Sequence, residues 1–456
     1  MNKMFYPQSV AVVGASNSDT NMGRNIVQNL ITWGYSGEVY PVNPRGEDVL
    51  GLNGYSSLSE IGKPIDLVVA FVPAKVVPGV MDECAALGVR RMAVPSGGFS
   101  EYGESGDELT RLVAAKAVEY GIRFVGPNGL TLINTENGLC LPFLTLKKRE
   151  PGSISIVSQS GGVGLSLMMF LDNAAATFNK FISVGNKVSM DELDFLEYLG
   201  DDPGTRVICL FLESVVRGRR FGEVASRIDK PILVYKANTT EAGARTAASH
   251  TAALANDDAV VDGMFRQAGI IRVRSIRRLI DMARAFELPP IRGNRIAVVS
   301  QAGGYTVLCA DEAHRRGFTF PPLSREFLDG MKEYVRSDVI RMGNPLDLGD
   351  IHSTDEILYA LDRVLGQPDI DGVALVLLRR SDAKYDGAYA RMQRPPYADL
   401  QGLMNKHHKP ISMCLLTQSA FLREVQAEVG YPIFEIPEDA VEALRVLRDH
   451  YSRRPA

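Results

Sequence analysis

Short apolar runs alternate with amphipathic stretches through the first third of the chain. Runs with the length and β-branched composition of buried strands occur at residues 9–13, 38–42, 67–72, 91–95 and 123–125. Between them, apolar residues recur at helical spacing over 23–33, 76–87 and 108–120. This order of strands and helices predicts an α/β fold built on a parallel, doubly wound sheet.

The same alternation begins again twice, each time after a connector that contains Pro and Gly. The connector 147–152 precedes strand-like runs at 154–157, 206–212 and 231–235, and the connector 288–293 precedes another at 295–299. A chain of 456 residues also has room for roughly three domains of about 150 residues. We therefore expect three domains, at residues 1–146, 147–288 and 289–456.

The second and third series share a short sequence pattern. Residues 156–164 read IVSQSGGVG and residues 298–306 read VVSQAGGYT, so each is a strand end, a turn of small residues and a helix start. Two such copies about one domain apart indicate an internal duplication of one α/β unit. Both turns direct backbone N–H groups and a helix N-terminus at one point, which is a favourable place for an anion.

Composition excludes several functional classes. The chain is 45% hydrophobic and 23% charged, which is typical of a globular protein. Its net charge of −4 gives no positive electrostatic field that would attract nucleic acid or an anionic membrane. No apolar run reaches the length of a membrane span or a signal peptide, so we expect a cytoplasmic protein. Its five cysteines and six histidines are too scattered to predict disulfides or a metal site.

The loop after the first strand, residues 14–24, leads from a strand end into a helix start. Such a loop suits a phosphate group, although a plain strand–helix turn is the alternative. The loop lacks the GxGxxG pattern, and no acidic residue ends the second strand. Both features argue against the interpretation of the chain as a nicotinamide-dependent oxidoreductase. A nucleotide with an additional phosphate, bound by Arg24 or Arg45, fits this loop better.

Three later strands end in loops of small residues and prolines. These loops are residues 71–74, 95–100 and 126–129. Because ligands of an open parallel sheet bind at the carboxyl ends of its strands, all three should lie on one edge. Small side chains there would let a long, thin ligand lie against the backbone.

His250 stands apart from the other histidines. Small alanines surround it, and Ser249 and Thr251 offer hydroxyl groups beside it. Its pKa is ordinarily about 6.5, so near neutral pH one ring nitrogen is a free nucleophile. The simpler alternative is a helix or loop histidine with no chemistry.

Taken together, the motifs resemble a known family. The segments 9–16, 95–100, 126–128, 158–162, 185–187 with 191–192, and 249–251 look like those of the NDP-forming acyl-CoA synthetases, which are relatives of the succinyl-CoA synthetase α subunit. The resemblance covers essentially the whole chain. It implies a Rossmann-like CoA-binding domain followed by two flavodoxin-like doubly wound domains.

The resemblance also implies a reaction and its residues. An acyl-CoA, phosphate and ADP would give a free acid, CoA and ATP, through an acyl phosphate and a phosphohistidine. His250 would be that histidine, and Glu213, after the strand at 206–212, would orient its ring. The helix that begins after residues 158–162 would stabilise the phosphoryl charge.

Further site residues follow from the same likeness. The residues expected to bind coenzyme A are Gly14, Ser16, Gly23, Arg24, Asn43, Arg45, Val72, Pro73, Ser96, Gly97, Pro127 and Asn128. Those expected to bind phosphate are Ser158, Ser160, Gly161 and Gly162. We find no module for the nucleotide, so ADP or ATP with Mg²⁺ is expected on a separate ATP-grasp β subunit of a hetero-oligomer.

Some questions remain open at this level. The chain departs from the family pattern at Gly129, where a cysteine is usual, and at Ala252 and Asn256, where glycines are usual. A non-catalytic sensor of CoA or acyl-CoA is therefore the main alternative to an enzyme. Neither the acid nor the choice between ADP and GDP follows from the residues.

Overall fold

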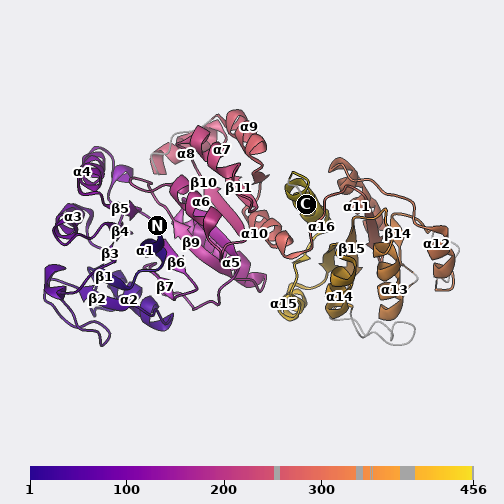
Figure 1. The fold of residues 1–456 in the computed structure, drawn as a ribbon, viewed down its shortest axis with the longest axis horizontal. Coiled ribbons are helices and arrows are strands. Elements are labelled where there is room, and N and C mark those ends of the chain that lie inside the picture. Colours follow the sequence, from indigo (N-terminus) through magenta and orange to yellow (C-terminus); the bar gives the residue numbers. More distant parts are fainter. Residues whose placement is uncertain (251–256, 335–341, 350, 352, 381–395, 454–456) are drawn as a thin grey trace. The chain divides into compact units, whose positions relative to one another are not determined.

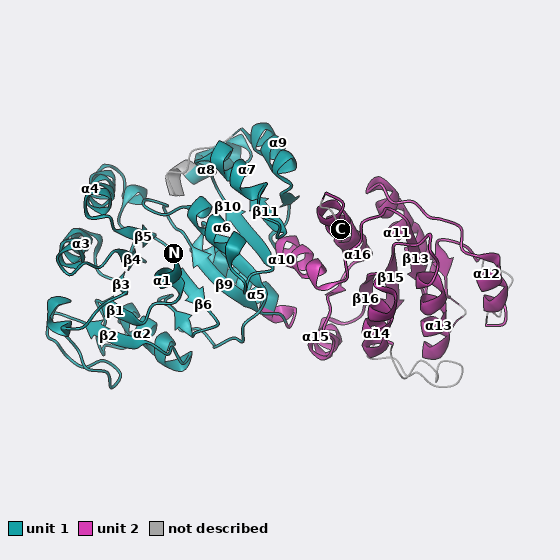
Figure 2. Ribbon diagram, viewed as in Figure 1, with its two compact units in different colours: residues 1–171, 176–276 teal, residues 172–175, 277–456 magenta. Residues whose placement is uncertain are grey.

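A computed structural model describes the chain except for residues 251–256, 335–341, 350, 352, 381–395 and 454–456 (Figure 1), and except for the side chains of residues 248–250. The chain forms two compact units (Figure 2). Unit 1 comprises residues 1–171 and 176–276, and unit 2 comprises residues 172–175 and 277–456. Unit 1 contains two sheets and unit 2 contains one.

The first sheet of unit 1 has five parallel strands. In chain order they are β1 (Ser9–Val13), β2 (Glu38–Val42), β3 (Leu67–Ala70), β4 (Arg91–Ala93) and β5 (Arg123–Val125). Their spatial order is β2-β1-β3-β4-β5. The helices of this part are α1 (Asn2–Phe5), α2 (Met22–Thr32), α3 (Val77–Ala86) and α4 (Glu104–Tyr120), with the 3-10 turns η1 (Ser59–Ile61), η2 (Ala74–Val76) and η3 (Ser100–Tyr102).

Alternation along the strands explains how helices cover both faces of this sheet. Val10 and Val12 of β1 belong to one core, with Ile26 of α2. Ala11, between them, belongs to the other core, with Met81 of α3. Successive side chains of a strand point to opposite faces, so one apolar run serves both layers. Figure 1 shows α2 on one side of the strands and α3 and α4 on the other.

The second sheet of unit 1 has seven strands. They are β6 (Thr131–Asn134), β7 (Leu139–Cys140), β8 (Ile154–Ser158), β9 (Phe178–Ser183), β10 (Val207–Leu212), β11 (Ile232–Lys236) and β12 (Ile271–Val273), in the order β12-β11-β10-β8-β9-β6-β7. The strands β6 and β7 pair antiparallel at its edge. Both precede residue 147, where we expected the second domain to begin, and the three-domain division remains a proposal.

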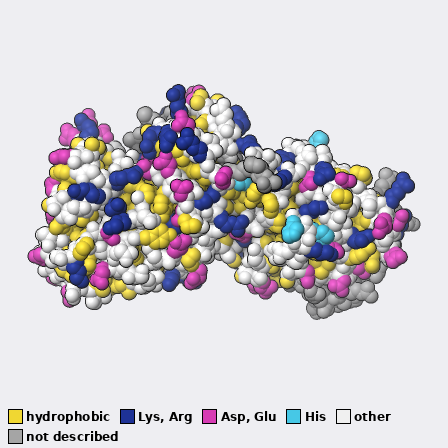
Figure 3. Space-filling model, in the orientation of Figure 1, with side chains coloured by type: hydrophobic (Ala, Val, Ile, Leu, Met, Phe, Trp, Pro, Cys, Tyr) yellow, Lys and Arg dark blue, Asp and Glu magenta, His cyan; other side chains and the backbone are white. Residues whose placement is uncertain are grey.

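The helices around the second sheet are α5 (Gly161–Asn173), α6 (Glu192–Asp201), α7 (Gly218–Ala225), α8 (Glu241–His250) and α9 (Asp258–Ala268). Asp191 begins α6 with a capping box, because its side chain accepts a hydrogen bond from the first turn while Asp194 accepts one from the Asp191 backbone. Figure 3 shows Lys and Arg side chains gathered over the part of unit 1 that contains α7 and α8.

Unit 2 holds a third parallel sheet. Its strands are β13 (Ile296–Ser300), β14 (Leu346–Asp347), β15 (Gly372–Leu378), β16 (Ile411–Leu416) and β17 (Ile433–Phe434), in the order β14-β13-β15-β16-β17. Its helices are α10 (Ile276–Arg284, of which all but Ile276 lie in unit 2), α11 (Gly303–Arg315), α12 (Arg325–Met331), α13 (Thr354–Leu365), α14 (Tyr397–His407), α15 (Ser419–Glu428) and α16 (Pro437–Tyr451), with η4 (Ala285–Glu287).

The three sheets share one parallel topology. If the parallel strands of each are numbered from its own first strand, all three have the order 2-1-3-4-5. This is a doubly wound order, in which ligands bind beyond the carboxyl ends of the strands near the first and third strands. The predicted α/β fold of doubly wound domains is therefore confirmed. No helix in the described part of the chain is long and apolar enough to span a bilayer.

Candidate functional site

Glu213 and Ser214 directly follow β10, and hydrogen bonds from their backbone N–H groups hold them in place. The side-chain oxygen of Gln159 accepts hydrogen bonds from the backbone N–H groups of Glu213, at 2.9 Å, and Ser214, at 3.1 Å. Gln159 itself follows β8, the neighbour of β10, and only 7% of its surface is exposed. One buried amide therefore fixes the backbone that carries the predicted catalytic carboxylate.

Two buried lysines hold the same backbone from the other side. Lys236, the last residue of β11, donates to the carbonyl oxygen of Glu213 at 2.8 Å. Lys187 donates to the carbonyl oxygen of Ser214 at 2.9 Å and to its hydroxyl at 3.0 Å. All four backbone polar groups of Glu213 and Ser214 are thus bonded to three side chains, which makes this strand end unusually well fixed.

The ammonium group of Lys187 also has a buried carboxylate partner. The Lys187 Nζ atom lies 3.0 Å from a carboxylate oxygen of Glu192, and the two side chains are 4% and 1% exposed. A buried charge is tolerated when it is paired and hydrogen-bonded. The Lys187 ammonium group meets both conditions through Glu192 and Ser214, whereas the paired oxygen of Glu192 has no hydrogen-bond partner among the described residues. Glu192 therefore serves to hold Lys187 against the Ser214 backbone.

The turn after β8 has the geometry of an anion site. The Ser158 hydroxyl donates to the carbonyl oxygen of Ser160 at 2.5 Å, which closes the turn. Helix α5 then begins at Gly161, and a side chain at Gly162 would point into open space. The first N–H groups of a helix have no partner within it, so they and the helix dipole attract negative charge. The expected phosphate role of this turn stays a prediction.

A cavity of about 300 Å³ joins these elements. Its wall includes Glu213, Gln159, the start of α5 at Ser160 to Gly162, and Asn128 and Gly129 from the loop after β5. An apolar part of the wall is formed by Leu130, Phe143, Leu144 and Leu165. Among the described residues that line this cavity, Glu213 is the one with a charged side chain. The sequence thus predicted separately several residues that the fold brings together.

His250 is the last residue of α8, and its side chain lies outside the described part of the chain. The start of α8 is fixed by Thr240, whose hydroxyl accepts a hydrogen bond from the Gly243 N–H group at 3.1 Å. Leu212 and Lys236 lie opposite each other in the parallel pair of β10 and β11, so α8 follows the same sheet edge as Glu213. The role of His250 remains a prediction.

The loop after β1 closes tightly onto the start of α2. Gly14 has φ of +95°, and a Cβ atom there would lie 2.2 Å from the carbonyl oxygen of Phe71, so no other residue fits. Asn21 organises the loop: its side-chain oxygen accepts from the N–H groups of Arg24, at 2.7 Å, and Ser16, at 3.1 Å. An Asn just before a helix is a common N-cap, and this signal could have identified Asn21 from the sequence.

The two predicted phosphate-binding arginines differ in their surroundings. The Arg24 Nε atom is buried without a hydrogen-bond partner among the described residues, and the Nη2 atom of the same side chain lies 3.9 Å from the exposed Asp19 carboxylate. A buried unpartnered donor at a helix start fits a phosphate oxygen. Arg45 is 80% exposed and pairs with Glu47. Asn43 uses its side-chain oxygen to fold its own turn, accepting from the Arg45 and Glu47 N–H groups.

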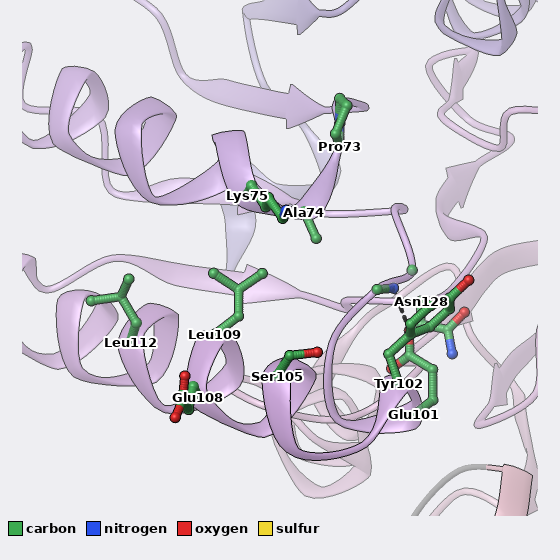
Figure 4. A pocket seen from close by; sticks show the side chains of 12 residues that line it. Pro73, Ala74, Lys75, Glu101, Tyr102, Ser105, Glu108, Leu109, Leu112 and Asn128 are labelled. Atoms are coloured by element: carbon green, nitrogen blue, oxygen red, sulfur yellow. Dashed lines mark hydrogen bonds between the residues drawn. The ribbon is translucent and has the colours of Figure 1, made fainter.

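A second and larger cavity, of about 1140 Å³, lies beside the first sheet of unit 1 (Figure 4). The cavity is lined by three of the residues predicted to bind CoA, Pro73, Gly97 and Asn128. Leu109 and Leu112 of α4 also line it. Asn128 lines both cavities, so they adjoin at this side chain.

Other predicted residues frame this larger cavity rather than line it. The Ser96 hydroxyl donates to the carbonyl oxygen of Val72 at 2.6 Å, which joins two of the expected loops. Pro127 follows a cis peptide bond after Gly126. Gly23 packs against the loop after β1, since a Cβ atom there would lie 2.7 Å from the Gly14 carbonyl oxygen. The assignment of all these residues to CoA stays a prediction.

Glu101 is a site residue for which we had no prediction. Its carboxylate accepts hydrogen bonds from the N–H groups of Gly98, at 2.6 Å, and Phe99, at 3.2 Å, and from the Asn186 side chain, at 2.5 Å. Burial raises the pKa of Glu101, but these hydrogen bonds outweigh burial and leave it below its usual value. Because Asn186 lines the smaller cavity, Glu101 connects the walls of the two.

Comparison with known proteins adds independent findings. Residues 8–135 match the family model of a CoA binding domain, and residues 151–286 match that of a succinyl-CoA ligase like flavodoxin domain. The chain is 34% identical to acetate–CoA ligase [ADP-forming] II of Archaeoglobus fulgidus, over 100% of this chain and 67% of that one. It is 32% identical to the α subunit of acetate–CoA ligase [ADP-forming] II of Pyrococcus furiosus, over 98% and 97% of the two chains.

A solved structure is similar over nearly the whole length. It is the dinucleotide forming acetyl-coenzyme A synthetase 1 of Candidatus Korarchaeum cryptofilum in complex with phosphate and ADP. The TM-score is 0.88 at 29% sequence identity, and the alignment covers 99% of this chain and 96% of the other. The likeness therefore includes both units, and not the CoA-binding region alone.

Proposed function

This chain belongs to the family of ADP-forming acyl-CoA synthetases, which are acid–thiol ligases, and we propose that it is the α-type subunit that carries both the CoA site and the phosphohistidine. The reaction is the interconversion of acyl-CoA, phosphate and ADP with free acid, CoA and ATP. One observation carries the proposal. The cavity of about 300 Å³ is lined by Glu213, the start of α5 and the loop that contains Asn128.

The first step is acyl transfer to phosphate. Phosphate would bind at the start of α5, where the N–H groups and the helix dipole stabilise its charge. An oxygen of hydrogen phosphate attacks the thioester carbonyl, the C–S bond breaks, and the proton of the phosphate passes to sulfur, so that CoA leaves as the thiol. The acyl phosphate stays in the cavity beside Glu213.

The second step moves the phosphoryl group to the protein. A ring nitrogen of His250 attacks phosphorus, the P–O bond to the acyl group breaks, and the acid leaves as a carboxylate. Glu213 would accept a hydrogen bond from the other ring nitrogen and stabilise the positive charge that develops on the ring. The phosphoryl group then passes from His250 to ADP.

CoA would lie along the carboxyl edge of the first sheet. The loop after β1 and the buried Nε donor of Arg24 fit its phosphate groups, and the larger cavity leads from Pro73 and Gly97 toward Asn128. The two cavities adjoin at Asn128, which would bring the thioester to the bound phosphate. The match of residues 8–135 to a CoA binding domain supports this placement.

The nucleotide would bind to a partner. We propose a separate ATP-grasp β subunit that holds ADP or ATP with Mg²⁺, so that the active enzyme is a hetero-oligomer. Two observations support this. The Pyrococcus furiosus relative, named as an α subunit, has nearly the same extent as this chain, whereas the chain spans only 67% of the Archaeoglobus fulgidus relative.

The test is phosphorylation of the chain. The purified chain with its β partner is incubated with an acyl-CoA and radiolabelled phosphate, without nucleotide, and we expect a base-stable, acid-labile label on the chain. His250→Ala should abolish the label, and Glu213→Gln should reduce it. His314→Ala, at an exposed histidine of α11 in unit 2, is the matched control and should be labelled normally. CoA binding without any label on the wild type would favour the sensor and contradict the proposal.

A further inference from the structure

Lys236 is a buried lysine whose contacts differ from those of Lys187. It is 5% exposed, and its Nζ atom donates to the carbonyl oxygens of Glu213, at 2.8 Å, and Ala237, at 2.5 Å. In the described part of the chain it forms no ion pair with a carboxylate. Burying an ammonium group without a counter-charge is costly, so an unpaired buried lysine at a candidate phosphoryl-transfer site calls for a functional explanation.

Its position connects the two segments that carry the predicted catalytic pair. The carbonyl oxygen of Glu213 belongs to the chain after β10, and that of Ala237 belongs to the chain after β11, four residues before α8 begins at Glu241. Helix α8 ends at His250. A single ammonium group therefore sets the distance between the Glu213 backbone and the start of the histidine helix.

We propose that Lys236 is a positioning residue for phosphoryl transfer, whose buried ammonium group aligns the Glu213 segment with α8 and supplies the positive charge that balances the incoming phosphoryl group. This inference rests on the proposed function. The site must hold a carboxylate and a phosphoryl group together, and like charges repel strongly in a buried environment. Lys187 is paired with Glu192, and Arg272 is paired with Asp258 and Asp262, so Lys236 is the one of these three described cations without an ion-pair partner.

The charged groups around Lys236 come from four elements. They are Asp258 of α9, Arg272 of β12, Lys187 after β9 and Glu213 after β10. Asp258 and Asp262 already form ion pairs with Arg272, at 2.5 and 3.0 Å. Burial, together with the repulsion of Arg272 and Lys187, lowers the pKa of Lys236 to about 8. A phosphate dianion nearby should raise that pKa again, so binding should be coupled to uptake of a proton.

The first experiment is the pH dependence of the phosphorylation assay. In the wild type we expect labelling to fall as Lys236 loses its proton above about pH 8. Lys236→Met should reduce labelling about tenfold or more at neutral pH, because two charge-assisted hydrogen bonds are lost, and it should remove the alkaline fall. Lys236→Arg keeps the charge and should restore labelling and move the fall to higher pH.

Lys230→Met is the matched control. The Lys230 ammonium group also donates to two carbonyl oxygens, of Leu199 at 2.8 Å and Asp202 at 2.5 Å, and burial likewise lowers its pKa. It lies before β11 rather than at the end of that strand, away from Glu213. Lys230→Met should therefore keep the wild-type labelling rate and pH profile. Labelling by Lys236→Met at the wild-type rate across pH 7 to 9 would overturn the proposal.

A second measurement does not depend on turnover or on a stable Lys236 variant. Inorganic phosphate is titrated into the full wild-type chain near pH 8.5 by calorimetry in buffers of different ionisation enthalpy. We expect proton uptake on binding in the wild type and in Lys230→Met. Binding of phosphate without proton uptake would overturn the role of Lys236. Absence of labelling in the wild type would instead count against the proposed function, so the two failures can be distinguished.

Discussion

The side-chain oxygen of Gln159 accepts a hydrogen bond from the backbone N–H group of Glu213 at 2.9 Å. Unit 2 repeats this relationship with a different outcome. Gln301, in the duplicated turn after β13, accepts from the backbone N–H group of Leu378 at 3.0 Å. Leu378 therefore stands in the third sheet at the position that Glu213 has in the second sheet, so an apolar side chain replaces the carboxylate. The two repeated units share the glutamine that binds the backbone after the strand, but only the second sheet has an acidic residue there.

This pair of glutamines gives a matched test. Gln159→Leu leaves two backbone N–H groups without an acceptor, which costs about 1–3 kcal/mol for each buried group. We expect it to lower the stability of unit 1 and to reduce phosphorylation at least about tenfold, because Glu213 loses its alignment. Gln301→Leu should lower the stability of unit 2 and leave phosphorylation unchanged. Equal labelling of the two variants, measured with folding monitored by circular dichroism, would contradict this role of Gln159.

The wall of the smaller cavity predicts the class of acid. Five apolar side chains line it, from Pro95, Leu130, Phe143, Leu144 and Leu165, and none of its described lining residues is a cation. A second carboxylate on the acid would therefore be buried without a partner. A cavity of about 150 Å³ already holds a benzene ring, so this one, of about 300 Å³, has room for an apolar tail.

We expect monocarboxylic acids with apolar tails to give a higher kcat/KM than dicarboxylic acids, in an assay of CoA release with the β partner present. Leu165→Ala should enlarge the cavity and shift the preference toward bulkier tails. An equal or higher kcat/KM for a dicarboxylic acid would show that the acid does not bind against this wall.

The different surroundings of the two arginines predict different contributions to CoA binding. Arg24→Gln should weaken binding about tenfold, because the buried Nε donor would lose a charge-assisted hydrogen bond to phosphate. Arg45→Gln should have a smaller effect, since that side chain is 80% exposed and screened by solvent. Calorimetric titration with CoA measures both. A larger loss with Arg45→Gln would reverse the assignment.

Unit 2 contains a carboxyl group whose protonation should affect stability. Burial raises the pKa of Asp281 from 3.8 to about 6, although Arg277 at 3.0 Å opposes the shift. A raised pKa means that the stabilising contribution is full below about pH 4 and is lost as the pH rises through 6. At about 1.4 kcal/mol per unit of pKa, the loss is on the order of 3 kcal/mol.

Urea unfolding of the full chain between pH 4 and 7 tests this. The free energy of unfolding of unit 2 should fall with rising pH more in the wild type than in Asp281→Asn, which cannot ionise. The difference between the two proteins isolates this group from the other carboxylates. Parallel curves for the two proteins would mean that Asp281 does not titrate in this range.

The fold could be predicted from the sequence because most of its strands are buried on both faces. Such strands appear as continuous apolar runs, and β1 and β10 lie within one residue of the predicted ranges. The edge strands β6 and β7 carried no such run. They are short, and β6 pairs with β9, which lies more than 40 residues away in the sequence, while β7 pairs with β6.

The candidate site could be predicted from the sequence only in part. The resemblance to the family identified Glu213, and the small residues before a helix start identified the turn before α5. The support around them was not predictable. Gln159, Lys187 and Lys236 bind the backbone of Glu213 and Ser214 through contacts 23 to 55 residues apart, which no local pattern encodes. The segments 158–162 and 185–187 were recognised as motifs without these roles, and a lysine at the end of the otherwise apolar strand β11 was a further sign.

Asn128 is the boundary between the two cavities, and this has a kinetic consequence. If CoA binds in the larger cavity and phosphate in the smaller one, as we propose, the thioester meets the phosphate beside the Asn128 carboxamide. A bulky residue at this position should leave the affinity for each substrate intact while preventing their encounter. The chain would then bind both reactants and form no product.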